Sequence, residues 1–308
     1  MSELPAALRI GFVGAGRLGK ALAWSLSAAG LRITHVFSAG GQQAVALAAR
    51  IPGCEPVADR QQVVDGCDLV FIVTPDGAIE AAAAGLRWRA GMGVVHCSGV
   101  TEVDALCSAA DQGAWIGGFH PMQTFGDPLA AMASLPGSTI TIEAPEPLNG
   151  WLVALATRLD CRVNRLPPGM RGRYHAAAGF TSQFINALFA EAARVWESWG
   201  ATEDDALRAL MPMARGTLAS IESAGIAGGM PGPVSRGDLG SIEKHMHALD
   251  DLGQHTLAFY RVLCASTIAL AVERGSIDEA RALQFRAVLA RTPKTRPASS
   301  LAQNDWHS

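Results

Sequence analysis

Short apolar runs alternate with amphipathic segments from residue 9 to about residue 167. The runs that we expect to form strands cover residues 9–14, 33–38, 68–74, 93–98, 115–120, 138–143 and 161–166. Apolar runs of this length, separated by helical segments, are typical of a parallel sheet with helices on both faces. The first half of the chain is therefore expected to form a doubly wound, mostly parallel α/β sheet.

The pattern changes at Leu166-Pro167-Pro168-Gly169, beyond which apolar residues recur at helical spacing. We expect a single helix over residues 174–199, buried in the core of a domain or of a dimer, because this stretch is nearly all apolar, alanine and aromatic. A second helix is expected over residues 202–224, interrupted at Pro212. The second half of the chain is therefore predicted to be all helical.

The rest of that half contains one long loop and further helices. Residues 225–240 are too rich in glycine and proline for a helix or strand, and long ordered loops are usually functional. Ser241 is expected to cap the next helix. A capping box, Ser276 to Glu279, is expected to open a last helix that reaches Arg291.

The strand expected at residues 9–14 leads directly into a glycine-rich turn with the spacing G-x-G-x-x-G, at Gly14, Gly16 and Gly19. Gly14 allows a tight turn, Gly16 lets the backbone approach a pyrophosphate, and Gly19 allows close packing of helix on strand. The alanine-rich helix that follows directs free N–H groups and its positive dipole end at the phosphates. This unit predicts a Rossmann-like dinucleotide-binding fold.

Three segments follow from these patterns. We predict a Rossmann-like domain over residues 1–167, an all-helical substrate and dimerisation domain over residues 168–292, and a disordered tail over residues 293–308. The residues expected to bind the cofactor are Gly14, Ala15, Gly16, Arg17, Leu18, Gly19, Ser38, Thr74, Pro75 and Ser98.

The end of the second strand bears on the choice of cofactor. An acidic residue there would bind the ribose of NAD and repel a 2′-phosphate, but this chain has Ser38-Ala39-Gly40-Gly41-Gln42. The arginine usual in NADP sites is also missing at this turn. NADP is favoured, and NAD is the alternative.

Two later strand ends carry small polar residues, in Thr74-Pro75-Asp76 and in Cys97-Ser98-Gly99. Open α/β sheets bind ligands at the carboxyl edge of their strands, so both ends are candidate binding sites. The alternative is purely structural, with Asp76 in a turn or helix cap and Ser98 as a local loop residue.

His120 ends the strand over residues 115–120 and is followed by Pro121. An imidazole with an ordinary pKa near 6.5 is a natural proton donor or acceptor near neutral pH. A core histidine bonded to a backbone carbonyl is the alternative. We predict a role for His120 in proton transfer.

Further candidates lie in the helical half. His175, Ser182 and Asn186 fall on one line of the helix expected over residues 174–199, as a polar stripe facing a wet cleft or as an interhelical hydrogen-bond network. Arg236 could bind a substrate carboxylate bidentately, or could pair with Asp238 to hold its loop.

Charge and composition narrow the partners. The net charge is −3 and no basic run occurs, which argues against nucleic acid and favours a small-molecule substrate. No signal-peptide core or charge-free apolar run long enough for a membrane span is found. Six scattered cysteines without a C-x-x-C motif look like reduced, buried thiols, so a cytoplasmic protein is expected. His245 and His247 lie on different helix faces, and no metal site is expected.

Four motifs, in order, carry a family resemblance. They are the glycine loop, Phe119-His120-Pro121-Met122-Gln123-Thr124-Phe125, Tyr174-His175-Ala176-Ala177-Ala178, and Gly232-Pro233-Val234-Ser235-Arg236-Gly237-Asp238 with His245. Up to about residue 275 the chain resembles Rossmann-like proteins whose C-terminal half is the domain of unknown function 2520. That family is similar to the 6-phosphogluconate-type reductases, which include pyrroline-5-carboxylate reductase, ketopantoate reductase, β-hydroxyacid dehydrogenases and prephenate dehydrogenase.

The resemblance implies an active site between a Rossmann domain and a helical domain that dimerises. Prephenate dehydrogenases carry a similar His-Pro whose histidine contacts the substrate hydroxyl, which implies proton transfer by His120. Ketopantoate and β-hydroxyacid enzymes use a lysine and a following asparagine on the first long helix of the second domain. This chain departs from them, because it has His175 near that point and no lysine.

The resulting hypothesis is an NAD(P)H-dependent oxidoreductase that reduces a C=O group, as in a 2-oxo acid such as ketopantoate, or a C=N group. The candidate catalytic residues are His120, Ser98, His175, Asn186 and Arg236. One alternative is an NADP-binding sensor without turnover, and another is a dehydrogenase that oxidises a hydroxy acid. We expect a homodimer through the helices over residues 174–199 and 241–274, because they carry an excess of apolar surface.

Overall fold

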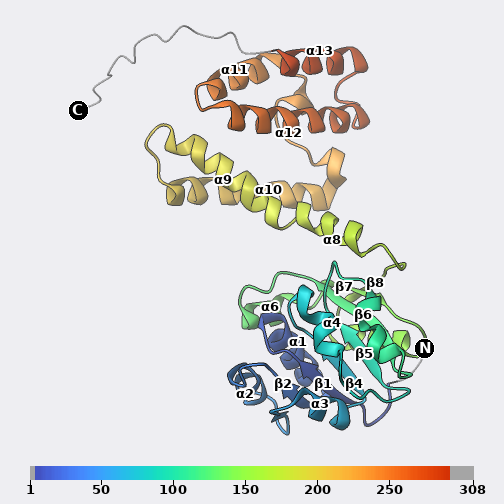
Figure 1. The fold of residues 1–308 in the computed structure, drawn as a ribbon. Coiled ribbons are helices and arrows are strands. Elements are labelled where there is room, and N and C mark those ends of the chain that lie inside the picture. The colour runs from blue at the N-terminus through green and yellow to red at the C-terminus, as the bar shows by residue number, and fades with distance from the viewer. Residues whose placement is uncertain (1–3, 292–308) are drawn as a thin grey trace. The chain divides into compact units, whose positions relative to one another are not determined.

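The computed structural model describes residues 4–291, which form two compact units, residues 4–183 and residues 184–291 (Figure 1). Each unit is described separately. The predicted boundary between residues 167 and 168 stays a prediction, although α8 (Arg171–Phe180) groups with the first unit. The tail predicted over residues 293–308 lies outside the described residues.

The first unit is built on one eight-stranded sheet with the order β3-β2-β1-β4-β5-β6-β7-β8. Its strands are β1 (Arg9–Val13), β2 (Arg32–Phe37), β3 (Glu55–Pro56), β4 (Leu69–Ile72), β5 (Gly93–His96), β6 (Trp115–Met122), β7 (Thr139–Glu143) and β8 (Arg162–Arg165). Only β6 and β7 pair antiparallel. The mostly parallel doubly wound sheet predicted from the alternating pattern is confirmed.

Helices cover both faces of this sheet. The helices are α1 (Arg17–Ala28), α2 (Gln42–Ala48), α3 (Arg60–Gly66), α4 (Ile79–Ala83), α5 (Cys107–Ala110), α6 (Pro128–Ser134) and α7 (Leu148–Arg158), with 3-10 turns η1 (Asp76–Ala78) and η2 (Val103–Leu106). On one face α1, α2 and α7 pack on Leu69 and Phe71 of β4, and on the other α3, α4 and α5 pack on Val70 and Ile72. Successive strand residues point to opposite faces, so a strand buried on both sides is apolar throughout.

All seven predicted strands are present, with two differences from the prediction. The two-residue edge strand β3 is missed, because Glu55-Pro56 carries none of the apolar signal of a buried strand. The sixth strand continues past His120 to Met122, because antiparallel pairing with β7 extends to Pro121 and Met122. His120 therefore lies inside a strand pair rather than at its end.

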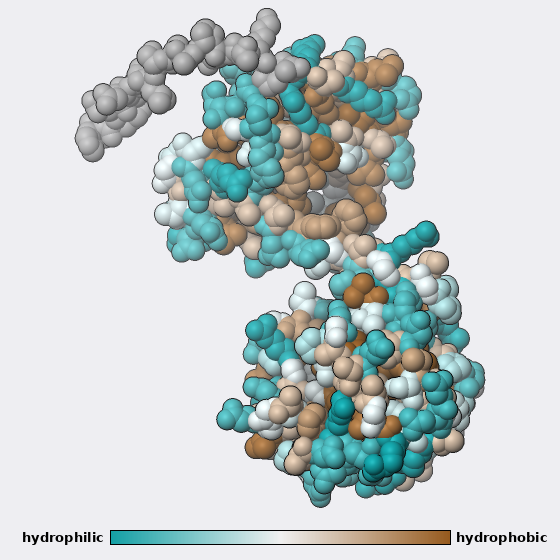
Figure 2. Space-filling view, in the orientation of Figure 1, coloured by the Kyte–Doolittle hydropathy of each residue, from teal (hydrophilic) through white to brown (hydrophobic). Residues whose placement is uncertain are grey.

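The second unit is helical. It contains α9 (Gln183–Glu197), α10 (Glu203–Gly228), α11 (Leu239–Asp250), α12 (Gln254–Glu273) and α13 (Glu279–Ala290), with the 3-10 turn η3 (Val234–Arg236). Its core lies between α11, α12, α13 and η3, around Val234, Ile242, Ile268 and Phe285. Apolar residues are visible on the surface of this unit in Figure 2. Leu188 is 41% and Ile226 67% exposed.

The single buried helix predicted over residues 174–199 is wrong. The chain leaves the helix in a turn at Thr181 and Ser182, which separates α8 from α9. In α9 only Ala193 is buried within the chain. The predicted polar stripe therefore does not form on one helix, because Ser182 lies in the turn, and His175 and Asn186 belong to different helices.

Three predicted helix boundaries also differ. The helix α10 continues through Pro212, and its non-helical residue is Gly225 (φ 76°), a conformation that glycine adopts at little cost. It reaches Gly228, so the predicted loop over residues 225–240 is shorter. Asp238 rather than Ser241 caps α11, and Asp278 rather than Ser276 caps α13, because each carboxylate accepts the backbone N–H three residues later.

The helix α12 is long and apolar enough to cross a membrane by length and composition alone. It also carries Arg261 at its centre, and its Cys264, Ile268 and Ala271 are buried in the core of the second unit. Length and composition alone are weak evidence for a membrane span, and these three residues pack in the core of the second unit.

The burial of each leucine predicts how much its replacement by alanine destabilises the fold. Leu69→Ala in β4, whose side chain is fully buried, should lower the free energy of unfolding by about 2–5 kcal/mol, because it leaves a cavity in the core. The matched variant Leu129→Ala in α6, where the leucine is 48% exposed, should change it by less than about 0.5 kcal/mol. Urea unfolding followed by circular dichroism measures both, and equal effects would contradict this core assignment.

Candidate active site

The glycine loop forms an open cradle between β1 and α1. The backbone N–H of Gly14 donates to the carbonyl of Phe37 (2.8 Å), and Gly14 has a φ of 110°. A Cβ there would lie 2.6 Å from the carbonyl oxygen of Val73, so the turn requires glycine. A Cβ on Gly16, by contrast, would meet nothing within 4 Å.

The amino end of α1 is available to a ligand. Gly16 is the N-cap and provides no side-chain cap, and the first turn contains no acidic residue. The first N–H groups of a helix have no partner within the helix. Those of Arg17 and Leu18 are therefore free to bind a ligand beside the glycine loop. Gly19 packs against Val73, because a Cβ there would lie 3.0 Å from the Val73 Cγ2 atom.

A cavity of about 470 Å³ lies beside this cradle. It is lined by Gly14, Ala15 and Gly16, by Ser38, Ala39, Gly40 and Gln43 after β2, by Thr74 and Pro75 after β4, and by Arg60, Ala78, Ala81 and Ala82. Six of the predicted cofactor residues line it. Ser98, Arg17, Leu18 and Gly19 are not among its lining residues.

Two observations indicate that the cavity fits a dinucleotide. The hydroxyl of Thr74 is buried and has no hydrogen-bond partner within residues 4–291, although a buried hydroxyl normally has one. The lining residues include one cation, Arg60, and no carboxylate. The Arg60 guanidinium donates to the carbonyls of Ala81 (2.8 Å) and Ala82 (3.3 Å), which places it at the cavity wall. Neither Arg60 nor Gln43 was predicted.

Ser38 forms a hydrogen bond within the segment that follows β2. Its hydroxyl oxygen accepts the backbone N–H of Ala44 (3.0 Å), which fixes the segment between β2 and α2. Lys20 on α1 donates to the side-chain oxygen of Gln43 (2.5 Å), so a second cation lies beside this segment.

A second cluster lies where α8 packs on β6 and β7. The register pairs Gly118 with Glu143, and two residues further along it pairs His120 with Thr141. Side chains of directly paired residues lie on the same face of a sheet. On α8, Arg171, Tyr174 and His175 are spaced three and four residues apart and so share one face. Arg171 reaches the first pair of strand residues, and Tyr174 reaches the second.

Arg171 is fully buried, which is rare for an arginine. Its Nε donates to Glu143 (2.8 Å) and its Nη1 donates to the carbonyl of Ser98 (2.8 Å). The guanidinium occupies the space above Gly118, where a Cβ would lie 1.7 Å from Nη2. Gly118 is therefore required by this arginine.

His120 of β6 contacts α8 one helical turn after Arg171, at Tyr174. Its Nδ1 is 2.7 Å from the hydroxyl of Tyr174. Its ring is 6.1 Å from that of His175, centroid to centroid, and a Cβ on Gly99 would lie 2.9 Å from His120 Nε2 and 2.5 Å from His175 Cδ2. The absence of a side chain at Gly99 lets the two imidazoles face the same space.

The environment of His120 keeps it neutral. Burial, followed by the nearby His175 and Arg171, lowers the pKa of His120 to about 4, while Asp76 acts in the opposite direction. The ordinary pKa assumed from the sequence does not hold, because burial and a nearby guanidinium both disfavour the imidazolium. His175 is exposed.

Ser98 has a structural role in this site. Its hydroxyl donates to Thr101 Oγ1 (2.9 Å) and accepts the N–H groups of Val100 (3.2 Å) and Thr101 (3.0 Å). Its carbonyl accepts from Arg171. A further role of Ser98 toward cofactor or substrate stays a prediction.

Asn186 and Arg236 belong to the second unit, and their predicted roles stay predictions. Arg236 is exposed, and within residues 4–291 its side chain has no hydrogen bond or ion pair. The alternative pairing with Asp238 is present only as an electrostatic interaction: hydrogen bonds from the Ser241 hydroxyl (2.6 Å) and backbone N–H (3.0 Å), followed by the charge of Arg236, hold the pKa of the Asp238 carboxyl below its usual value. Across the described part of the chain no cluster of three or more metal-ligating side chains is found.

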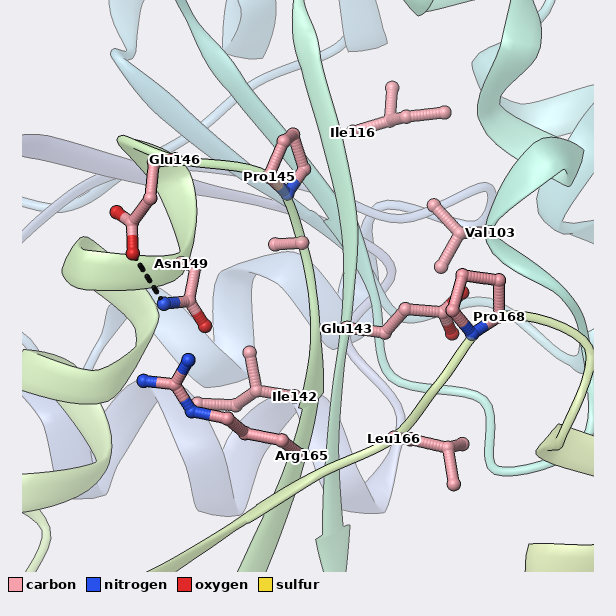
Figure 3. Close-up of a pocket in the computed structure, with 11 residues that line it drawn as sticks. Val103, Ile116, Ile142, Glu143, Pro145, Glu146, Asn149, Arg165, Leu166 and Pro168 are labelled. Carbon is pink, nitrogen blue, oxygen red and sulfur yellow. Dashed lines mark hydrogen bonds between the residues drawn. The ribbon is translucent and has the colours of Figure 1, made fainter.

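Another cavity, of about 460 Å³, lies beside β6, β7 and the segment that follows β8 (Figure 3). Ile116, Ile142, Val103 and Leu166 give it apolar walls, and Glu146 bonds Asn149 at its edge (2.7 Å). No predicted site residue lines it. Only Glu143 connects it with the cluster described above.

Sequence reasoning missed Arg171, Tyr174, Glu143 and the glycines Gly99 and Gly118. One signal was available, because a glycine inside a strand often marks the close approach of another group. Gly118 lies two residues before His120 in a strand. Nothing local showed that an arginine four residues before His175 fills that space.

Two family models match the chain. A Rossmann-like domain matches residues 2–121, and the domain of unknown function 2520 matches residues 138–267. No curated protein sequence matches.

Solved structures share the fold. A Bacteroides fragilis protein assigned as an NADP oxidoreductase is 25% identical, covers 85% of this chain and 98% of its own, and has a TM-score of 0.67. A Thermotoga maritima protein is 20% identical (90% and 99% covered, TM-score 0.65). A reductive aminase from Aspergillus terreus, solved with NADPH and ethyl-5-oxohexanoate, is 16% identical (91% and 100% covered, TM-score 0.65). With both domains matched in order, the chain belongs to the Rossmann-like proteins that carry the domain of unknown function 2520.

Proposed function

We propose that this protein is an NADP-dependent oxidoreductase that reduces a C=O or C=N group of a small carboxylate substrate. One observation carries the proposal. The glycine-loop cavity and His120 lie at the same carboxyl edge of the sheet, because the register aligns Ile72 with His96 and His96 with Gly118, and both Thr74 and His120 follow two residues later. Open α/β sheets place their reactions at this edge.

The residues of the cradle fit NADP. The open space at Gly16 and the start of α1 would receive the pyrophosphate, and the unpartnered Thr74 hydroxyl would gain a partner. A 2′-phosphate meets no carboxylate among the residues that line the cavity, and Arg60 and Lys20 are the nearby cations. When bound, the reduced nicotinamide supplies a hydride to the substrate carbon. The reductive aminase of the same fold was solved with NADPH.

The two histidines have different proposed roles toward the substrate. At neutral pH His120 is uncharged, so it acts as a hydrogen-bond donor that polarises the oxygen or nitrogen of the reacting group. His175, which is exposed and borders the same space, is the proposed proton donor to that atom. Both imidazoles face the space left by Gly99, so one substrate atom can meet them together.

We propose two classes of substrate, which the geometry of the site does not distinguish. A 2-oxo acid such as ketopantoate supplies a C=O group, and a cyclic imine carboxylate supplies a C=N group. Asn186 and Arg236 are proposed to bind the hydroxyl or amine and the carboxylate. The same groups would serve the reverse oxidation of a hydroxy acid, because proton donor and acceptor exchange roles in the two directions.

We also propose a homodimer in the cytoplasm. Leu188 of α9, Ile226 of α10 and Val262 of α12 are 41%, 67% and 64% exposed within one chain. Exposed apolar residues gathered on helices are typical of an interface between copies.

The first test is calorimetric binding of NADPH and NADH, followed by turnover with ketopantoate and with pyrroline-5-carboxylate. Gly16→Ala should keep its melting temperature, because the new methyl meets no protein atom, but should weaken NADPH binding about tenfold or more by occupying the phosphate space. Gly216→Ala in α10, where a Cβ also meets nothing within 4 Å, is the matched control: it should leave NADPH affinity unchanged and should only raise the melting temperature, because alanine favours a helix interior over glycine. Equal NADPH affinity in both variants would remove the cradle from cofactor binding.

Steady-state kinetics on whichever substrate turns over test the histidines. His120→Ala and His175→Ala should each lower kcat by about 10²–10⁴-fold, with NADPH affinity unchanged. His247→Ala, an exposed histidine of α11, should leave kcat unchanged. Tight NADPH binding without turnover on either substrate would instead favour a nucleotide sensor.

Sedimentation at micromolar concentration should give twice the mass of one chain. Leu188→Glu with Ile226→Glu should shift the protein toward the monomer, because charge replaces exposed apolar surface. Leu129→Glu, an exposed leucine of the first unit, is the control and should stay dimeric. A monomeric wild-type protein would contradict the proposed dimer.

A further inference from the structure

A row of hydrogen-bonding side chains crosses the sheet behind His120. The strand register places His120 of β6 opposite Thr141 of β7, and Thr141 opposite Asn164 of β8. Thr141 is fully buried, whereas Asn164 is exposed at the edge strand. The row therefore runs from the surface of the first unit to the proposed catalytic imidazole.

Tyr174 joins this row from α8. The Asn164 amide donates to Thr141 Oγ1 (3.1 Å), and the Tyr174 hydroxyl lies 2.7 Å from His120 Nδ1. Burial raises the pKa of Tyr174, and the Thr141 hydroxyl acts in the opposite direction, which links the two bonds. Each of these groups is held by regular structure, since three come from paired strands and one from a helix. Nothing in the proposed reaction uses Tyr174, Thr141 or Asn164 directly.

The donors and acceptors give the row one direction. The amide nitrogen of Asn164 can only donate, so Thr141 accepts there and has its own proton for the Tyr174 oxygen. The Tyr174 proton is then directed at His120 Nδ1. A neutral imidazole that accepts at Nδ1 carries its proton on Nε2.

We propose that Asn164, Thr141 and Tyr174 act as positioning residues that hold His120 in its Nε2–H tautomer, so that the N–H faces the substrate. The inference rests on the proposed function for the role of the Nε2–H group. The other side of the ring fits, because Nε2 lies toward Gly99 and His175. In the opposite tautomer Nε2 would present a lone pair, which cannot donate to an oxygen or imine nitrogen.

Nitrogen NMR of the full chain without cofactor or substrate tests this proposal. Protonated and unprotonated ring nitrogens give distinct ¹⁵N signals, and His120→Gln identifies those of His120. At neutral pH the wild-type protein should show Nε2 protonated and Nδ1 unprotonated. Tyr174→Phe should give a mixture of tautomers, because Nδ1 loses its donor. A wild-type protein with the proton on Nδ1, or a Tyr174→Phe variant with unchanged signals, would overturn the proposal.

The chain offers a matched control. It contains two tyrosines, and the other, Tyr260, also lies 2.8 Å from a histidine Nδ1, that of His245 in the second unit. Tyr260→Phe removes the same kind of bond and should leave the His120 signals unchanged. If Tyr174→Phe does not fold, Thr141→Val serves instead, and it should broaden or shift the His120 Nδ1 signal, whereas Thr141→Ser should restore it.

Activity separates this proposal from the proposed function. With an accepted substrate, Tyr174→Phe should lower kcat about tenfold and leave KM within about twofold, because the substrate still binds but meets a less ordered donor. A higher KM with an unchanged kcat would contradict a positioning role. The tautomer of His120 is measured without ligands, so the two proposals can fail separately. The expected NMR result without turnover would contradict the proposed function and support the inference about His120.

Discussion

The geometry of the candidate site depends on one buried guanidinium. Arg171 lies in the interior without exposure to water and is held by a carboxylate, Glu143, and by the carbonyl of Ser98. Removing an arginine from water costs several kcal/mol, and a close pair with additional hydrogen bonds offsets that cost. The site exists because these partners come from β7 and from the end of β5, on either side of β6. An arginine that bonds both strands across β6 fixes α8 above the carboxyl end of the sheet.

The position of α8 then determines the chemistry at His120. Tyr174 and His175 follow Arg171 by three and four residues, so they lie on the same face of the helix and meet the next residues of β6 and β7. The guanidinium that anchors the helix also lowers the pKa of His120, together with burial and His175. The contacts that anchor α8 therefore also favour the neutral form of the His120 imidazole.

Local patterns predicted the features that are local. Each apolar run of the first half became a strand, and the glycine loop became the expected turn, because burial on both faces and a tight turn are set by neighbouring residues. The antiparallel pairing of β6 with β7 was not predicted, and neither was the extension of β6 past His120. The pKa of His120 could not be predicted either, because Arg171 and His175 are more than 50 residues away in the sequence.

The second half shows the same limit in another form. The break at Thr181 and Ser182 interrupts a stretch whose composition is uniformly favourable for a helix, and Pro212 lies inside a helix that composition alone would end. Composition alone therefore locates neither the break nor the continuation of these helices. The caps show a smaller error, since Asp238 and Asp278 compete with nearby serines for the same N-cap role and only the backbone geometry decides between them.

Two glycines show how the structure separates a site for a ligand from a site filled by the protein itself. A Cβ on Gly118 would collide with Arg171, so this glycine makes room for a side chain of the same chain. A Cβ on Gly16 would meet nothing, although Gly16 caps a helix whose first N–H groups lack partners and lies beside a cavity lined by the unpartnered Thr74 hydroxyl. In the first case a side chain of the same chain fills the space. In the second the space stays open beside helix donors and a buried hydroxyl without a partner, and this difference favours a cofactor at the amino end of α1.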